Sequence, residues 1–81
     1  MNESNSRYYR TKNLNLASFL LAKTQQLVNI DKSNPKRADF VFVNSPELMD
    51  LVESFHYGKE CLVDARKFAL AIKELKQKIY D

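Results

Sequence analysis

Apolar residues along the chain fall into short clusters whose spacing predicts three strands and three helices. Runs rich in aromatic and β-branched residues predict strands at residues 7–11, 26–30 and 38–43. Between and after these runs, apolar residues three and four positions apart predict amphipathic helices. The resulting order, β-α-β-β-α-α, predicts a small α+β domain whose three-stranded sheet, antiparallel around its hairpin, is packed by helices.

Capping residues set the expected ends of the helices. Thr11 or Asn13 can cap the first helix, which is about ten residues long. Ser45, followed by proline, is expected to cap the second helix, and Gly58 suits the left-handed residue that follows its end. Asp64 is expected to cap the third helix.

The hairpin is expected to have a loose tip, because residues 31–37 are polar and contain an Asn-Pro pair. The strand that follows is apolar on both faces. Phe40 and Phe42 point to one face, and Val41 and Val43 point to the other. Either helices cover both faces, or one apolar face is left for a partner protein or a second copy of the chain.

The last predicted helix carries its apolar residues on one stripe over about four turns. The expected buried stripe consists of Ala65, Phe68, Ala69, Ile72, Leu75 and Ile79. The opposite side is rich in lysine, including Lys73, Lys76 and Lys78. That side is either a solvated face or a surface that faces phosphate groups.

Length and composition narrow the class of protein. Eighty-one residues are too few for a second domain at about 100–200 residues each. We therefore expect one domain over residues 7–81 and a disordered tail over the polar residues 1–6, which do not resemble a secretory signal. No run approaches the roughly 20 apolar residues of a membrane span, so we expect a cytoplasmic protein that does not bind membranes. One Cys and one His exclude an internal disulfide and a Cys/His zinc site formed by this chain alone.

The net charge of +3 is unevenly distributed along the chain. Residues 1–37 carry a net charge of +5, residues 38–64 carry −5, and residues 65–81 carry +3. Two interpretations are open. The basic ends can neutralise the acidic middle, or the fold can separate the charges into an acidic face and a basic face that attracts phosphates.

Residue types that could support catalysis or metal binding occur without the partners that such chemistry needs. His56 is near a helix end, where its protonated form interacts favourably with the helix dipole. Cys61 has Glu60 beside it, which raises rather than lowers a thiol pKa. Three acids on the second helix, at positions 47, 50 and 53, match a solvated face. We expect no enzyme, no metal site, no cofactor and no small-molecule substrate.

A basic and aromatic segment near the N-terminus is a stronger indication of function than the candidate catalytic or metal-binding residues. Aromatic rings can stack on unpaired bases while arginine and lysine neutralise phosphates. The hairpin tip can extend such a surface. The predicted nucleic-acid-binding residues are Arg7, Tyr8, Tyr9, Arg10, Lys12, Lys36 and Arg37, with Lys73, Lys76 and Lys78 as further candidates. The alternative for this segment is an edge strand with ordinary solvated charges.

One set of residues recurs in a known pattern along most of the chain. The set consists of Tyr9, Thr11, Leu16, Ala17, Phe19, Leu20, Phe40, Phe42, Glu47, Leu48, Leu51, Val52, Gly58, Val63, Asp64, Ala65, Arg66, Phe68, Leu75, Lys76, Ile79 and Tyr80. This pattern resembles a short domain family of unknown function found in bacteria and their phages or mobile elements. That family commonly has a glycine after its first helix, where this chain has Lys23, Thr24 and Gln25. The resemblance implies a fold and a bacterial or phage source, and it implies no activity.

Two functions from different classes follow from these observations. The first is a small non-catalytic module that binds nucleic acid as an accessory protein of a bacterium or phage. The alternative is a protein-interaction or dimerisation module that does not bind nucleic acid. Binding to phosphates should weaken steeply with salt, whereas apolar docking should not.

Overall fold

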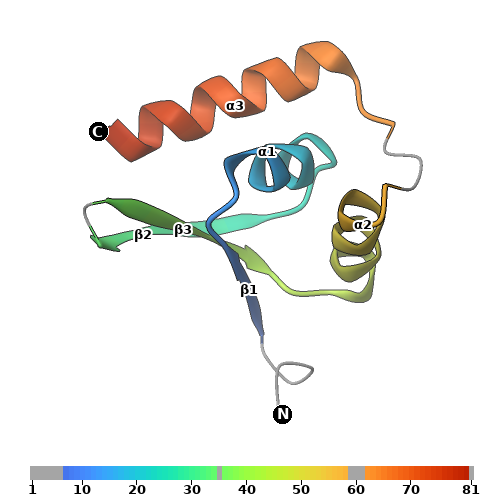
Figure 1. Cartoon of the computed structure of the whole chain (residues 1–81), viewed down its shortest axis with the longest axis horizontal. Helices are drawn as coiled ribbons and strands as arrows, with labels where there is room; N and C mark the ends of the chain where they lie inside the picture. The colour runs from blue at the N-terminus through green and yellow to red at the C-terminus, as the bar shows by residue number, and fades with distance from the viewer. Residues whose placement is uncertain (1–6, 35, 59–61, 81) are drawn as a thin grey trace.

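A computed structural model describes residues 7–34, 36–58 and 62–80 (Figure 1). The expected tail at residues 1–6 and Cys61 lie outside the described residues. The element order is the predicted β-α-β-β-α-α, and the α+β class is confirmed. The elements are β1 (Tyr8–Thr11), α1 (Leu14–Ala22), β2 (Leu27–Asn34), β3 (Arg37–Val43), α2 (Pro46–His56) and α3 (Ala65–Tyr80).

The three strands form one antiparallel sheet in the order β1-β3-β2. The most apolar strand, β3, is therefore central, and the side chains of β1 and β2 flank its own side chains along both of its edges. Tyr9 pairs with Phe42 on one face of the sheet, and Arg10 pairs with Val41 on the other. Phe40 and Phe42 are both buried, as their spacing predicts.

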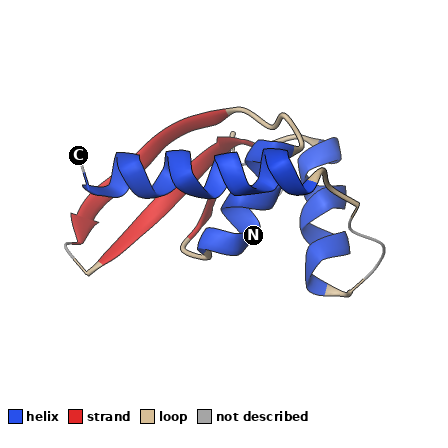
Figure 2. Cartoon of the chain, turned by 90° about the horizontal axis from the view of Figure 1, so that it is seen from above, coloured by secondary structure: helices blue, strands red, loops and turns tan. Residues whose placement is uncertain are grey.

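Helix α1 lies between the sheet and α3, as Figure 1 shows. Its residues from Leu16 to Leu20 are all buried, because the sheet, α2 and α3 together surround it. Seen from above, α3 lies nearest the viewer and crosses in front of the strands (Figure 2). The core thus forms on one face of the sheet, around α1, with Leu48 of α2 and Leu75 of α3 completing it. No helix in the described ranges is long and apolar enough to cross a membrane.

The hairpin differs from the sequence prediction. Strand β2 continues through the polar residues 31–34, and β3 begins at Arg37, so the expected loose tip over residues 31–37 is wrong. Asp31 pairs with Asp39, and Asn34 pairs with Arg37. Polar residues are tolerated here because β2 is an edge strand with solvent beside it. The carboxamide of Asn34 accepts from the backbone N–H of Lys36 at 3.0 Å and tightens the turn.

The buried stripe of α3 is also displaced from the prediction. Ala65 and Ala69 are exposed, whereas Ala71, which the prediction left out, is buried. The buried and half-buried positions are Phe68, Ala71, Ile72, Leu75 and Ile79. The reason is that α3 packs on a rounded helix, α1, so the face it buries follows that contact rather than the widest apolar stripe of its own sequence.

The helix ends agree with the expected caps. The side chains of Asn13, Ser45 and Asp64 accept from backbone N–H groups in the first turns of α1, α2 and α3. Gly58 follows α2 with a positive φ of 67°. Thr24, after α1, also has a positive φ of 65°, so a β-branched residue adopts the left-handed conformation that suits glycine.

Candidate nucleic-acid interface

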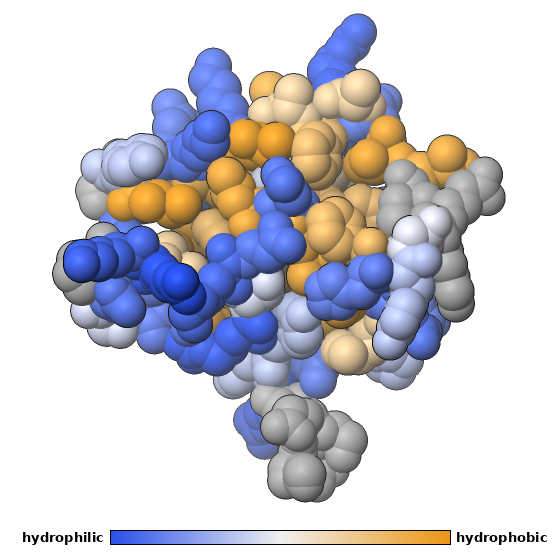
Figure 3. Space-filling view, viewed as in Figure 1, coloured by the Kyte–Doolittle hydropathy of each residue, from blue (hydrophilic) through white to orange (hydrophobic). Residues whose placement is uncertain are grey.

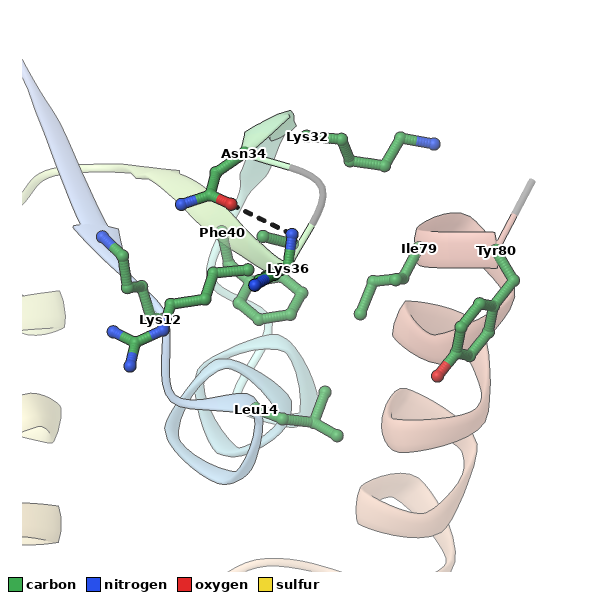
Figure 4. A pocket seen from close by; sticks show the side chains of 10 residues that line it. Lys12, Leu14, Lys32, Asn34, Lys36, Phe40, Ile79 and Tyr80 are labelled. Atoms are coloured by element: carbon green, nitrogen blue, oxygen red, sulfur yellow. Dashed lines mark hydrogen bonds between the residues drawn. The ribbon is translucent and has the colours of Figure 1, made fainter.

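A groove lies where three distant parts of the chain meet: the hairpin tip, the β1–α1 junction and the last turn of α3 (Figure 4). It has a volume of about 450 Å³ and is open to solvent. Its lining consists of Lys12, Leu14, Lys32, Asn34, Lys36, Arg37, Ala38, Phe40, Ile79 and Tyr80. The tight hairpin creates this groove, because it carries the tip of β2 and β3 out beside the end of α3.

The charge of the groove is uniformly positive. Lys12, Lys32, Lys36 and Arg37 contribute cations, and no carboxylate occurs among the described residues that line it. All four side chains belong to exposed residues. Neither Lys36 nor Arg37 forms an ion pair with any residue that the structure describes. The groove therefore presents positive charge without an internal counter-charge beside these two residues.

Apolar groups form the floor of the groove. The ring of Phe40 lies near its centre in Figure 4, with Leu14 of α1 below the ring and Ile79 of α3 to its right. Phe40 is only 2% exposed, so the floor is part of the core and holds the rim in place. Tyr80 stands beside Ile79 at the edge and is 85% exposed.

Lys32 changes the electrostatics at the end of α3. Its ammonium donates to the backbone carbonyl of Lys78 at 3.1 Å, across 46 positions of sequence. The last carbonyls of a helix carry partial negative charge, which would repel an anion. Lys32 offsets that charge and also ties α3 to the hairpin.

A second group of charges lies on the open face of the sheet. Arg10 bridges to Asp31 at 2.5 Å and to Asp39 at 3.4 Å, and Lys12 contacts Asp39 at 2.9 Å. The Arg10 guanidinium therefore reaches from β1 across β3 to β2. Its register partner, Val41, is only 6% exposed, although no helix in the described part of the chain packs on this face. One of the expected apolar positions of the open face is thus concealed by the strands' own side chains.

These contacts stabilise the charged forms of both carboxylates. The pKa of Asp31 is lowered, chiefly because the backbone N–H of Ser33 donates to it at 3.0 Å, with Arg10 adding a smaller effect. The pKa of Asp39 is lowered chiefly by its hydrogen bond from Lys12. At neutral pH both acids are ionised and offset the charges of Arg10 and Lys12. The first interpretation of the charge pattern, internal neutralisation, therefore holds for this part of the chain.

The predicted basic-aromatic segment is divided by the fold. Tyr9 faces the core and is half-buried, and burial raises the pKa of its phenol, so its ring is not offered to a ligand on the open face. Tyr8 is 49% exposed on the opposite face. It pairs with Val43, at the far end of β3 from Arg37, about 20 Å away at 3.4 Å per residue. Arg7 and Tyr8 therefore do not join the groove.

The groove brings together three of the predicted residues, Lys12, Lys36 and Arg37. It also contains Lys32, from the hairpin tip that was expected to extend the surface, and Tyr80, which was not expected there. Lys32 could be expected near this surface from the sequence, because it belongs to the predicted hairpin tip together with Lys36 and Arg37. Nothing in the local pattern marks Tyr80, because its contact with the groove depends on how α3 docks. The acids at positions 47, 50 and 53 are on α2, and no group of three or more His, Cys, Asp or Glu among the described residues could hold a metal ion.

Comparison with known proteins identifies a family and no activity. A family model described as a domain of unknown function (DUF5659) matches residues 6–81. No curated protein and no solved structure matches the chain. The match confirms the resemblance to a short family of unknown function that the sequence pattern indicated.

Proposed function

Since the chain belongs to the DUF5659 family, whose function is unknown, we propose from its own surface that it is a non-catalytic module that binds nucleic acid. The binding site is the groove at the hairpin tip. One observation carries this proposal: four cations from two separate segments, the β1–α1 junction and the hairpin, line one groove, and no carboxylate is among its described lining residues. The whole chain has more basic than acidic residues and a pI near 9.1, which also favours binding to a polyanion.

The arrangement suits a polyanion better than a single small anion. The cations are exposed and spread around a groove of about 450 Å³, which is larger than one phosphate group needs. Neutralising several phosphates releases their condensed counterions, and this release drives binding that does not depend on sequence. The apolar floor and the Tyr80 ring offer contacts for sugars and bases beside the phosphates.

The same groove offers little for catalysis. Its described lining contains no His, Cys, Asp or Glu, which are the residues that most often act as general base or nucleophile near neutral pH. Lysine and tyrosine are present, but the residues of both types that line the groove are exposed. The groove is therefore assigned a binding role.

The proposal is tested by fluorescence anisotropy with labelled single-stranded DNA, single-stranded RNA and duplex DNA at about 50 mM and about 200 mM salt. We expect micromolar or tighter binding that weakens with salt. The variant Lys36→Gln/Arg37→Gln should flatten the slope of log K against log salt by about 1.4 for a single strand. Absence of binding to all three ligands at the lower salt concentration overturns the proposal.

A matched control separates the groove from net charge. Arg66→Gln/Lys67→Gln removes the same charge from exposed positions at the start of α3, about 20 Å from Tyr80 at 1.5 Å per residue. This control should retain nearly the wild-type slope. Equal losses in the two double variants would show that binding follows overall charge and not the groove.

A second candidate is supported by a different surface. Apolar side chains gather on the face shown in Figure 3, around α3 and α1. Leu62, which precedes α3, is 69% exposed, and Leu70, in the first half of α3, is 60% exposed. Such exposure is typical of a protein-binding or dimer surface. Association through it should be insensitive to salt and should be lost in Leu62→Ser/Leu70→Ser, as measured by analytical ultracentrifugation for self-association.

A further inference from the structure

A second hollow lies on the outer side of α3. It is lined by Ala69, Ile72, Lys73, Lys76, Gln77 and Tyr80, and no carboxylate is among these residues. Its volume is about 510 Å³, and it is more open than the groove at the hairpin tip. Tyr80 lines both hollows. The two basic hollows therefore meet at one exposed aromatic ring.

Tyr80 has the properties of a stacking platform. It is 85% exposed and is the most exposed of the large apolar side chains on the part of the chain that the structure describes. The cations of the hairpin tip lie on one side of it, and Lys76 and Lys73 lie on the other. An exposed ring between two sets of cations matches a chain in which phosphates alternate with flat bases.

We propose that the protein binds single-stranded nucleic acid along a continuous track. The track runs from Lys36 and Arg37 at the hairpin tip, across Tyr80, and along α3 past Lys76 and Lys73. This inference rests on the proposed function and adds to it the kind of nucleic acid and the path of the strand. A single strand is required because a base can lie flat on Tyr80 only when it is not stacked in a duplex.

The length of the track sets the site size. Seven positions separate Lys73 from Tyr80, which is about 10 Å along a helix at 1.5 Å per residue. With the groove beyond Tyr80, the track accommodates on the order of four nucleotides, the lower end of what a small single-strand-binding domain covers. Lys73 and Lys76, the further candidates from the sequence, thus lie on the same track as the hairpin residues. Their distance from the hairpin along the sequence does not suggest this.

The test compares Tyr80→Ala with wild type by anisotropy, using labelled oligothymidylate and oligouridylate of about ten nucleotides and a hairpin duplex of the same charge. Tyr80→Ala should weaken single-strand binding by about tenfold, because it removes the stacked ring. Tyr80→Phe should retain wild-type affinity, since stacking needs the ring and not the hydroxyl. Tyr57→Ala is the matched control, because Tyr57 is 73% exposed and follows α2, away from both hollows.

Lysines of the outer hollow provide a second readout. Lys73→Gln/Lys76→Gln should reduce the salt slope for single strands by about 1.4 and leave the helical circular dichroism unchanged. The two proposals fail separately. If no nucleic acid binds at low salt, the proposed function is wrong. If nucleic acid binds but Tyr80→Ala matches wild type, or the duplex binds as tightly as the single strands, the groove stands and the track is wrong.

Discussion

Replacing Asp39 with asparagine is expected to strengthen nucleic-acid binding, because this carboxylate offsets cations beside the groove. Asp39 contacts the ammonium of Lys12 at 2.9 Å and the guanidinium of Arg10 at 3.4 Å. Asparagine keeps the shape of the side chain and removes its charge. Lys12, which lines the groove, is then free to neutralise a phosphate.

The magnitude follows from counting cations in the groove. With Lys12 shared by Asp39, about three groove cations act on a single strand and contribute about −2.1 to the slope of log K against log salt. With all four acting, the groove contributes about −2.8. The contribution of Lys73 and Lys76 is the same in both proteins, so a fourfold rise in salt weakens Asp39→Asn about 2.6-fold more than wild type. If the added contact vanishes near 1 M salt, the variant binds about eightfold more tightly at 50 mM.

The assay is anisotropy titration of the same labelled oligothymidylate with wild type, Asp39→Asn and Asp50→Asn over a salt series. Asp50 is exposed on α2 and outside the groove, so its variant has the same change in net charge at a different site. Thermal unfolding followed by circular dichroism checks that each variant is folded. Equal gains in both variants, or weaker binding by folded Asp39→Asn, would refute the reasoning, because the effect would not then pass through Lys12.

Three further predictions concern the fold. The pKa values of Asp31 and Asp39 are lowered from their usual 3.8, so the stability that the two carboxylates contribute is present above that pH and is lost as the pH falls below it. The urea midpoints of Asp31→Asn/Asp39→Asn at about pH 6 and about pH 3 should therefore differ less than those of wild type. Leu20→Ala, at a fully buried position of α1, should destabilise the protein by about 3 kcal/mol in urea titration, whereas a loss under about 1 kcal/mol would contradict the central place of α1. Thr24→Gly should raise the free energy of unfolding by about 1 kcal/mol, because glycine adopts a positive φ without strain; a lower melting temperature would count against strain at this residue.

The candidate site was only partly predictable from sequence. Three residues of the predicted set, Lys12, Lys36 and Arg37, line one groove in the folded chain. The Arg10 side chain was predicted as a phosphate contact, but it bridges Asp31 and Asp39, which are 21 and 29 positions away. A charge pattern along a chain gives the number of cations and does not show which of them have a counter-charge in the folded state.

The local structure was determined by the sequence itself. Caps such as Ser45, the glycine after α2 and the apolar spacing within each helix act over a few residues, so the six elements and their order could be derived from the chain alone. The strand at residues 38–43 was equally clear from its aromatic and β-branched residues, whereas its central place in the sheet was decided by its pairing with β1 and β2.

Only the tertiary structure decided the extent of β2, the buried face of α3 and the groove. Strand β2 extends through polar residues because their backbone pairs with β3, and backbone pairing leaves no mark on side-chain type. The face of α3 was set by its contact with α1, which exposed Ala69 and buried Ala71. The groove depends on Lys32 reaching the carbonyl of Lys78, 46 positions away. Contacts of that separation arise from how whole elements pack, which no window of local sequence contains.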